Sequence, residues 1–193
     1  MPVNRSSLGC AFEIVETLVL TVVIFLVIQN FVAQPYRVEQ MSMERTLEQG
    51  QYVLVDKLSP RWDSYSRGDI VVFRPPESTP DDVPFIKRVI GVAGDRVEIR
   101  NGDVLVNGVA LDESSYVYDG QPTDFGGEES GHLVEDGTVF VLGDHRSNSA
   151  DSRVFGSVPV ENVIGRAVLR YWPISTLSIL ETPRYPDLVA QGT

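Results

Sequence analysis

Cysteine is almost absent from this chain, because Cys10 is the one thiol among 193 residues. A single thiol excludes an internal disulfide and any CxxC redox or zinc motif. Leu8-Gly9-Cys10 has a faint similarity to a lipoprotein cleavage box, but no apolar run precedes it to act as a signal. We therefore assign Cys10 no function.

Positive charge is also scarce. The chain has 16 basic and 27 acidic residues, which give a net charge of -11. A nucleic-acid-binding protein normally presents a basic face that neutralises phosphates, and no such face stands out here. The acidity is more typical of an exposed domain that is kept soluble by its charge. We expect no nucleic-acid partner, and no motif indicates a metal or another cofactor.

One long hydrophobic run is present, at residues 14–33, and it reads IVETLVLTVVIFLVIQNFVA. Twenty helical residues extend for about 30 Å, which matches the hydrocarbon core of a bilayer. A removable signal peptide would be followed by small residues at fixed spacing, and Phe31 and Ala33 do not fit that pattern. A buried core helix would need other apolar segments around it. The run therefore predicts a retained transmembrane helix, while Arg5 and Arg37 on its two sides leave the orientation undecided.

After the run, short apolar segments alternate with turn residues. Asn101-Gly102 lies between two such segments and is a strong hairpin signal. Helical periodicity is scarce, so we predict a mostly β domain. The expected organisation is a short cytoplasmic segment at 1–13, the helix at 14–33, a β-rich domain at 34–175 and a C-terminal tail at 176–193.

The segment that reads FIKRVIG places Lys87 on one face of a strand, between Phe85 and Val89. Burial between apolar neighbours lowers the pKa of a lysine and can leave a neutral amine that accepts a proton. Arg88 cannot act in this way because guanidinium stays protonated. The plainer interpretation is that Lys87 reaches solvent from an edge strand.

The segment GDHRSNSADSR is polar and rich in charges that can form ion pairs within a loop. By itself such a segment more often stabilises a loop than catalyses a reaction. His145 also permits a serine-histidine interpretation if it lies close to Ser42 together with an orienting acid. His132, in an acidic stretch, is a poorer candidate for a base.

Taken together, these segments resemble the bacterial type I signal peptidases, which are Ser-Lys enzymes that remove secretory signal peptides. The resemblance covers most of the chain, and its lysine and C-terminal motifs are specific at this length and spacing. The matching features are the apolar run, Ser42-Met43, RGDIVVF, FIKRVIGVAGD, the Asn-Gly hairpin and GDHRSNSADSR.

The resemblance implies a β fold of the signal peptidase type and a role for each matching residue. Ser42 is the nucleophile, Lys87 is the general base, and Ser149 orients the lysine amine. Four charged residues are implied to support the site, and four residues to line shallow apolar pockets for small side chains. The supporting residues are Asp144, Arg146, Asp151 and Arg153, and the pocket residues are Tyr36, Val38, Leu47 and Ile86.

Four positions depart from the family pattern. Glu39 and Gln40 replace the usual Pro-Ser, so the hydroxyl that normally provides a second oxyanion donor is missing. Gln40 or a backbone N–H is left to take that role. Arg45 replaces a proline, and His145 replaces the asparagine of the usual GDNR. None of these changes removes the nucleophile or the base, so we expect activity.

The resemblance also implies partners and a location. The substrates are secretory preproteins cut after Ala-x-Ala sites, close to the lipid bilayer and to the secretion translocon. The catalytic domain is expected on the extracytoplasmic side of a bacterial cytoplasmic membrane. Organellar processing peptidases are the nearest alternative, but the chain has no Arg- and Ser-rich transit segment. A self-cleaving repressor would carry a DNA-binding module instead of the apolar run, and a catalytically inactive binding domain would have lost Ser42 or Lys87.

Overall fold

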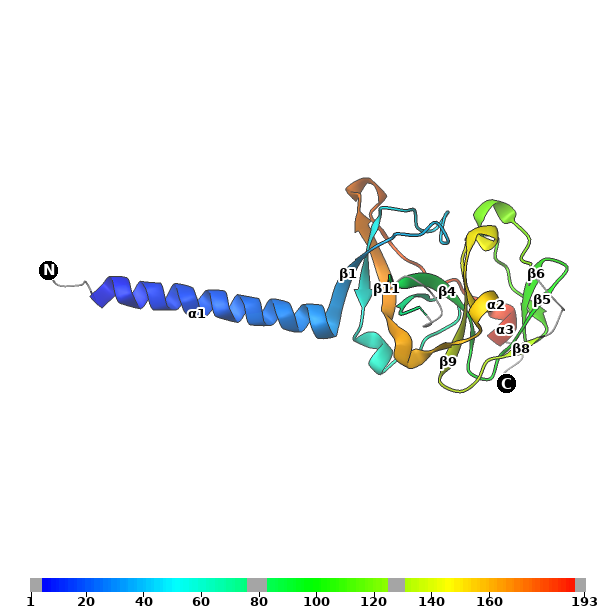
Figure 1. The fold of residues 1–193 in the computed structure, drawn as a ribbon, viewed down its shortest axis with the longest axis horizontal. Helices are drawn as coiled ribbons and strands as arrows, with labels where there is room; N and C mark the ends of the chain where they lie inside the picture. Colours follow the sequence, from blue (N-terminus) through cyan, green and yellow to red (C-terminus); the bar gives the residue numbers. More distant parts are fainter. Residues whose placement is uncertain (1–4, 76–82, 125–130, 190–193) are drawn as a thin grey trace.

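A long N-terminal helix projects from a β-rich domain in the computed structural model, which describes residues 5–75, 83–124 and 131–189 (Figure 1). Helix α1 spans Arg5–Val27, and the π-helical turn η1 (Ile28–Val32) leads directly into the first strand. The helix thus begins inside the segment 1–13, which we expected to precede it, and residues 1–4 lie outside the described part. Ala33, expected at the end of the helix, instead begins β1.

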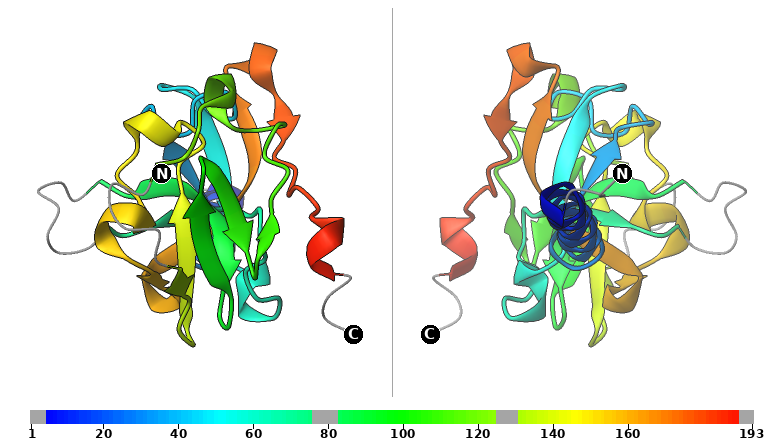
Figure 2. Two further views of the ribbon diagram at one scale, coloured as in Figure 1. Left: turned by 90° about the vertical axis from the view of Figure 1, so that its right-hand side faces the viewer. Right: turned by 90° about the vertical axis from the view of Figure 1, so that its left-hand side faces the viewer.

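Helix α1 is apolar, and its side chains from Phe12 to Val27 are exposed in the described part of the chain. Its stretch Phe12–Val32 has a mean hydropathy of 2.2 and is 0% buried inside the structure. The right view of Figure 2 shows the helix end-on in front of the β domain, and Figure 1 shows its length directed away from the domain. Apolar side chains on every face of an isolated helix fit an apolar surrounding rather than water. A transmembrane helix is therefore consistent with its length and composition.

The large sheet is antiparallel and has the strand order β1-β2-β11-β3-β4-β9-β10, with β12 paired to β11. Its strands are β1 (Ala33–Arg37), β2 (Tyr52–Asp56), β3 (Ile70–Phe73), β4 (Phe85–Val92), β9 (Thr138–Leu142), β10 (Val158–Pro159), β11 (Val163–Trp172) and β12 (Ser178–Ile179). The prediction of a mostly β domain is thus confirmed.

A second sheet of four strands has the order β7-β6-β5-β8. Its strands are β5 (Arg96–Arg100), β6 (Asp103–Val106), β7 (Val109–Ala110) and β8 (His132–Leu133). The predicted hairpin at Asn101-Gly102 joins β5 to β6, with φ angles of 53° and 90°. Two positive φ angles suit the twist of a tight hairpin, which explains the Asn-Gly pair.

The remaining helices of the described residues are short and connect or follow the strands. They are η2 (Ser59–Arg61), η3 (Tyr118–Gly120), η4 (Arg146–Asn148), α2 (Ser152–Phe155), η5 (Val160–Asn162), η6 (Ile174–Thr176) and α3 (Pro186–Val189).

Strand β4 lies at the centre of the packing. Ile86 packs in a core cluster with β2, Ile90 packs in a cluster with the small sheet, and Phe85 and Val89 pack in a third cluster with β9. Each buried side chain of this size contributes about 1.5–3 kcal/mol. The strand that carries Lys87 is therefore fixed from both faces and by ladders to β3 and β9.

The domain boundary expected at residue 175 needs a correction. Strand β12 pairs with β11, and Leu180 packs against the core cluster around β2. Tyr185 and Leu188 pack against the core cluster of the small sheet. The described part of the segment 176–193 thus belongs to the domain. Its apolar residues are separated by Pro183 and Pro186, so the sequence shows no regular period there.

Candidate active site

Ser42 lies in a turn within the loop that joins β1 to β2. The turn is closed by backbone hydrogen bonds from Glu44 N–H to the Met41 carbonyl, at 3.1 Å, and from Leu47 N–H to the Met43 carbonyl, at 2.7 Å. Met43 and Leu47 are buried in the core, with 1% and 0% of their surface exposed. These two apolar side chains hold the turn on the domain, and Ser42 directly precedes the first of them. Ser42 itself is 5% exposed.

The Ser42 hydroxyl meets the amine of Lys87. Lys87 Nζ lies 2.7 Å from Ser42 Oγ, and the lysine side chain is 1% exposed. The interpretation that Lys87 reaches solvent is therefore wrong. β4 is a central strand with β3 on one side and β9 on the other, so its side chains are covered.

Burial lowers the pKa of Lys87 from 10.5 to about 8, although the carboxylates of Asp151 and Asp144 act in the opposite direction. The ring of Phe85 lies 4.9 Å from Nζ and forms part of the apolar surroundings. A pKa of about 8 leaves a useful fraction of neutral amine near neutral pH. Ser42 and Lys87 thus have the geometry and the electrostatics of a nucleophile and its base.

Two further acceptors surround the lysine amine. Nζ lies 3.2 Å from the Ile86 carbonyl oxygen and 3.3 Å from Gln40 Oε1. A neutral amine has two N–H donors and one lone pair. If the two N–H groups donate to the Ile86 carbonyl and to Gln40 Oε1, the lone pair of the amine can accept a hydrogen bond from the Ser42 hydroxyl. Gln40, which sequence reasoning considered only as an oxyanion donor, therefore also contacts the base.

The Ser149 hydroxyl is buried close to the dyad and has no hydrogen-bond partner among the described residues. Its place is set by Gly143, where a Cβ atom would collide with the Ser149 hydroxyl and lie 2.6 Å from the Ser42 carbonyl oxygen. Glycine is thus required for these two serines to approach each other. No hydrogen bond joins Ser149 to Lys87, so its orienting role stays a prediction.

Asp144 forms a buried ion pair with Arg88. The distances are 2.8 Å from Arg88 Nε to Oδ1 and 2.7 Å from Nη2 to Oδ2. Thr46 Oγ1 donates to Oδ2 at 2.5 Å, and the Tyr116 ring lies 4.2 Å from the guanidinium carbon. The pair therefore ties the Ser42 loop, strand β4 and the loop after β9 together beside Lys87.

Asp151 and Arg146 stabilise the loop after β9. Asp151 caps α2, accepts a hydrogen bond from Gly143 N–H at 3.0 Å, and pairs with Arg153 through two bonds of 2.8 and 2.9 Å. Arg146 donates to the Gly143 carbonyl at 2.9 Å and forms a two-bond pair with Glu113. The four charged residues named from the sequence thus lie together in one network around this loop.

Sequence reasoning missed the partners that complete this network, namely Arg88, Thr46 and Glu113. Arg88 had a usable signal, because strict alternation along β4 places a second cation on a buried face. A buried guanidinium requires a carboxylate partner. Glu113 lies in a loop with no periodic pattern, and nothing in the sequence indicated its contact with Arg146.

Neither histidine hydrogen-bonds the Ser42 hydroxyl. His145 Nδ1 lies 2.6 Å from Glu44 Oε2, and its ring stacks on Tyr118 at 4.3 Å between centroids. His132 Nε2 lies 2.8 Å from Ser157 Oγ. The backbone N–H of His145 donates to the Ser42 carbonyl at 2.9 Å, so this residue contacts the Ser42 loop through its main chain.

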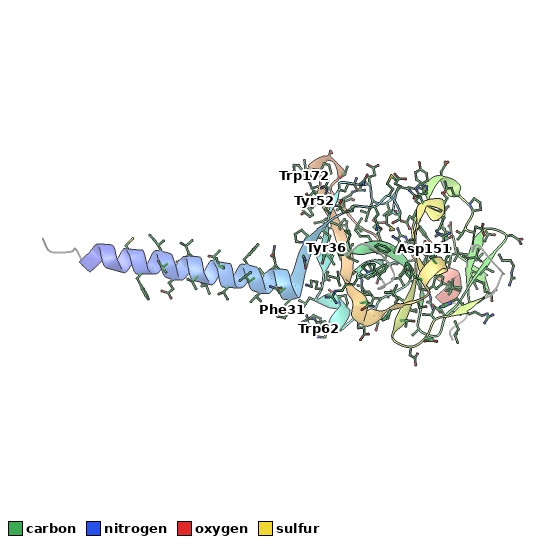
Figure 3. All side chains as sticks on the ribbon, viewed as in Figure 1. Phe31, Tyr36, Tyr52, Trp62, Asp151 and Trp172 are labelled. Atoms are coloured by element: carbon green, nitrogen blue, oxygen red, sulfur yellow. The ribbon has the colours of Figure 1, made fainter. Side chains whose placement is uncertain are left out.

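The four residues implied to line the substrate pocket separate into two groups. Val38 and Ile86 line a small hollow that also contains Ser42 and Gln40. Leu47 is fully buried in the core, and Tyr36 packs against that core from its edge. Phe31, Trp62 and Trp172 lie on the side of the domain from which α1 extends, whereas Asp151 lies deeper inside (Figure 3).

Comparisons with known proteins give a consistent result. The family described as signal peptidase, peptidase S26, matches residues 11–172. A signal peptidase I of Leptolyngbya laminosa is 40% identical over 176 residues, which cover 89% of this chain and 84% of that protein. A signal peptidase I of Bacillus caldolyticus is 41% identical over 152 residues, which cover 74% of this chain and 81% of that protein. A solved signal peptidase I of Enterococcus faecalis is 30% identical, with a TM-score of 0.41, and covers 54% of this chain and 97% of that chain. The chain belongs to the signal peptidase family, peptidase S26.

Proposed function

We propose that this serine peptidase cleaves signal peptides through an acyl-enzyme, with Ser42 as nucleophile and Lys87 as general base. The observation that supports this assignment most directly is the distance of 2.7 Å between Lys87 Nζ and Ser42 Oγ in a buried setting. Family membership supplies the reaction class, which is removal of signal peptides from preproteins. No metal or cofactor is needed for this chemistry.

In the first half of the reaction, the neutral Lys87 amine takes the proton of Ser42 Oγ as the oxygen attacks the scissile carbonyl carbon. The tetrahedral intermediate collapses when the lysine ammonium gives that proton to the leaving amine. The acyl-enzyme remains, and Lys87 is neutral again. In the second half, Lys87 takes a proton from water, which attacks the acyl carbon, and returns it to Ser42 Oγ.

The oxyanion of the intermediate needs hydrogen-bond donors. The Ser42 N–H donates to no other group among the described residues, so it is available for this role. Gln40 lines the same hollow, and its carbonyl oxygen faces Lys87. We assign the first donor to Ser42 N–H and leave Gln40 or another backbone N–H as the second. Loss of one such donor typically costs about 2.7–4 kcal/mol.

The preference for small residues before the cut follows from the hollow beside Ser42. Val38 and Ile86 form its apolar walls, and the space between them is narrow. A methyl side chain such as that of alanine fits, and larger side chains meet the walls. Leu47 and Tyr36 support this surface from the core and its edge. Cleavage after Ala-x-Ala sites is therefore the specificity we propose.

The anchor determines where the cut takes place. We propose that α1 and η1 cross the bacterial cytoplasmic membrane, with the domain on the extracytoplasmic side and close to the translocon. Eight residues, 34–41, lie between Ala33 and Ser42. Even fully extended they reach only about 30 Å, so Ser42 stays near the bilayer surface. The cleavage sites of membrane-inserted signal peptides emerge at that surface.

The full-length protein in detergent should cleave a preprotein with an Ala-x-Ala site. Ser42→Ala and Lys87→Ala should each abolish cleavage with unchanged thermal unfolding, because each removes one partner of the dyad. Full activity in either variant contradicts the assignment. His145→Ala is the matched control and should keep activity. If cleavage survives Lys87→Ala but is lost in His145→Ala, histidine is the base instead.

A further inference from the structure

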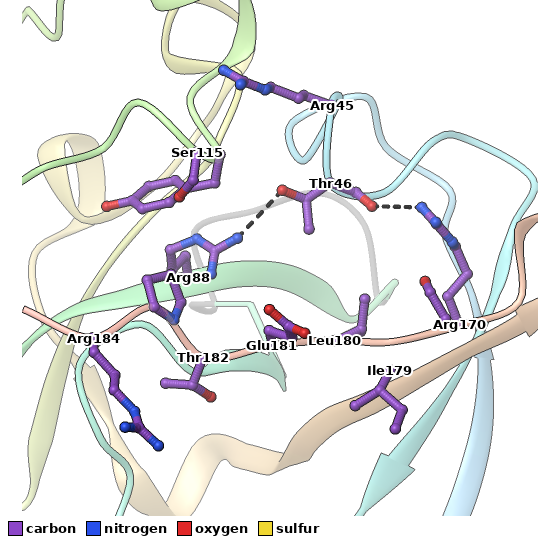
Figure 4. Close-up of a pocket in the computed structure, with 13 residues that line it drawn as sticks. Arg45, Thr46, Arg88, Ser115, Arg170, Ile179, Leu180, Glu181, Thr182 and Arg184 are labelled. Atoms are coloured by element: carbon purple, nitrogen blue, oxygen red, sulfur yellow. Dashed lines mark hydrogen bonds between the residues drawn. The ribbon is translucent and has the colours of Figure 1, made fainter.

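A large cavity separate from the hollow beside Ser42 has no role in the mechanism above. Its volume is about 800 Å³, and it lies between the Ser42 loop and the C-terminal segment. Arg45 and Thr46 line it from the loop, Arg170 lines it from β11, and residues 178–184 line it from the opposite side (Figure 4). The cavity exists because the C-terminal segment crosses the domain here.

The charge of this cavity is opposite to that of the chain. Four arginines line it, and Glu181 is the one acidic side chain among its described lining residues. Arg88 is neutralised by Asp144, but Arg45, Arg170 and Arg184 form no ion pair among the described residues. Three uncompensated positive charges and one negative charge leave about +2. In a protein with a net charge of -11, acidic partners are abundant, so three unpaired arginines around one cavity require an explanation.

Two of these arginines are held in place by neutral groups. Arg170 donates from Nε to the Thr176 carbonyl at 2.7 Å and from Nη1 to the Thr46 carbonyl at 2.9 Å. Arg45 donates from Nη1 to the Val117 carbonyl at 2.6 Å. These carbonyls fix the guanidinium groups but leave their charges and their remaining N–H donors free. Arg184 has no hydrogen-bond partner among the described residues, and its donors are all available.

We propose that this cavity binds a phosphate group, either as the free anion or as the headgroup of an anionic phospholipid. Guanidinium groups present planar pairs of donors that match phosphate oxygens. Near neutral pH the free phosphate anion carries close to two negative charges and would balance the remaining charge of about +2, whereas the phosphodiester of a phospholipid such as phosphatidylglycerol carries one negative charge and would balance half of it. The hydroxyls of Ser115, Ser178 and Thr182 also line the cavity and can complete its donor set.

The proposed site is linked to the catalytic loop. Figure 4 shows Arg88 and Arg170 reaching Thr46 from opposite sides. Arg45, next to it, has a φ of 81°, which a proline ring cannot adopt. An arginine thus stands where the family usually has a proline, and its guanidinium extends away from Thr46 to the Val117 carbonyl (Figure 4). A phosphate bound to Arg170 would hold the loop that carries Ser42, through the hydrogen bond from Arg170 to the Thr46 carbonyl.

The test uses the full-length chain in a neutral detergent and measures its thermal midpoint as inorganic phosphate replaces chloride at constant ionic strength. We expect a saturable rise, because a ligand of the folded state stabilises it. Arg184→Gln should weaken phosphate affinity about fivefold to tenfold, since it removes charge-assisted hydrogen bonds. Arg100→Gln is the matched control, because Arg100 is an exposed arginine that pairs with Glu98 on the small sheet. The phosphate affinity of this variant should equal that of the unchanged protein.

A second arm distinguishes the two sources of phosphate. The protein is placed in nanodiscs of phosphatidylcholine alone or with added phosphatidylglycerol. If phosphatidylglycerol raises the midpoint and removes the response to inorganic phosphate, and Arg184→Gln suppresses both effects, the ligand is the lipid headgroup. If inorganic phosphate acts equally in both discs, it is the free anion. Equal affinities of the Arg184→Gln and Arg100→Gln variants, or no saturable response in any arm, overturn the proposal. These readouts do not use cleavage, so they stand apart from the assignment of the dyad.

Discussion

Arg88 and Asp144 face each other through two nearly parallel hydrogen bonds, of 2.8 and 2.7 Å, with 2% and 0% of their side chains exposed. Arg88 is the neighbour of Lys87 on β4, and Asp144 follows Gly143 in the loop that holds Ser149. The pair joins the two segments that form the site, and its charges are compensated inside the core. We therefore expect catalysis to depend on this structural ion pair, although it does not touch the substrate in the proposed mechanism.

Asp144→Ala should lower the free energy of unfolding by about 3–5 kcal/mol, because it leaves the Arg88 charge buried without a partner. Thermal or chemical unfolding followed by the fluorescence of the two tryptophans measures the change. Glu98→Ala is the control, since its ion pairs with Arg96 and Arg100 involve exposed arginines and should contribute less than about 1 kcal/mol. Equal losses in the two variants would contradict a central role for the buried pair.

The rate of cleavage should rise with pH and level off above a midpoint near 8. Burial lowers the pKa of Lys87 to about 8, and only the neutral amine can accept the serine proton. Protonation therefore removes the base as the pH falls through that value. The pH dependence of kcat/KM for a peptide substrate reports this group in the free enzyme. A midpoint near 6.5, typical of histidine, would argue for His145 instead.

The sequence indicated the residues that meet in this candidate site, but not all of the partners that support them. The apolar run, the Asn101-Gly102 hairpin and the β-rich domain are confirmed, because each depends on a local pattern of a few residues. Lys87 could be proposed as a base from the alternation along β4, although its burial depends on neighbouring strands that the alternation does not reveal. The contact of Ser42 with Lys87 joins residues 45 positions apart, and only the resemblance to a family indicated it.

The contacts of Glu113 and of residues 178–188 could not be predicted for a different reason. They depend on how irregular segments cross the surface of the domain, and such segments have neither a period nor a turn signal. The same holds for Arg170. Its place on a strand can be predicted from the sequence, but its hydrogen bond to the Thr46 carbonyl cannot. Family motifs identify the chemistry, whereas these long-range contacts are particular to the folded chain.

Gly143→Ala should reduce cleavage strongly, because the added methyl group would collide with the Ser149 hydroxyl and lie 2.6 Å from the Ser42 carbonyl oxygen. Both serines would have to move, and a shift of about 1 Å in a catalytic group can cost a hundredfold in rate. The measurements are kcat with a peptide substrate and the thermal midpoint. Gly108→Ala is the control, since its Cβ meets open space at a φ of 81° in a turn of the small sheet. It should lose some stability to backbone strain and keep its activity.

Gln40→Glu should move the pH profile of cleavage upward by about 1 unit or more, because a carboxylate beside the amine favours the ammonium form. Gln40 Oε1 lies 3.3 Å from Lys87 Nζ, so the new charge would act at close range on a buried base. The pH dependence of kcat/KM measures the shift, and Glu98→Gln, which changes a carboxylate paired with Arg96 and Arg100 on the small sheet, should leave it unchanged.

Gln40→Ala separates the two roles open to this side chain. If its amide is the second oxyanion donor, kcat should fall by about 10²–10³ with little change in KM, because the lost hydrogen bond exists only in the transition state. If Gln40 acts only on the lysine, the loss should be small and should appear as a shift of the pH midpoint. An unchanged rate and an unchanged midpoint would exclude both roles and leave the second donor to a backbone N–H.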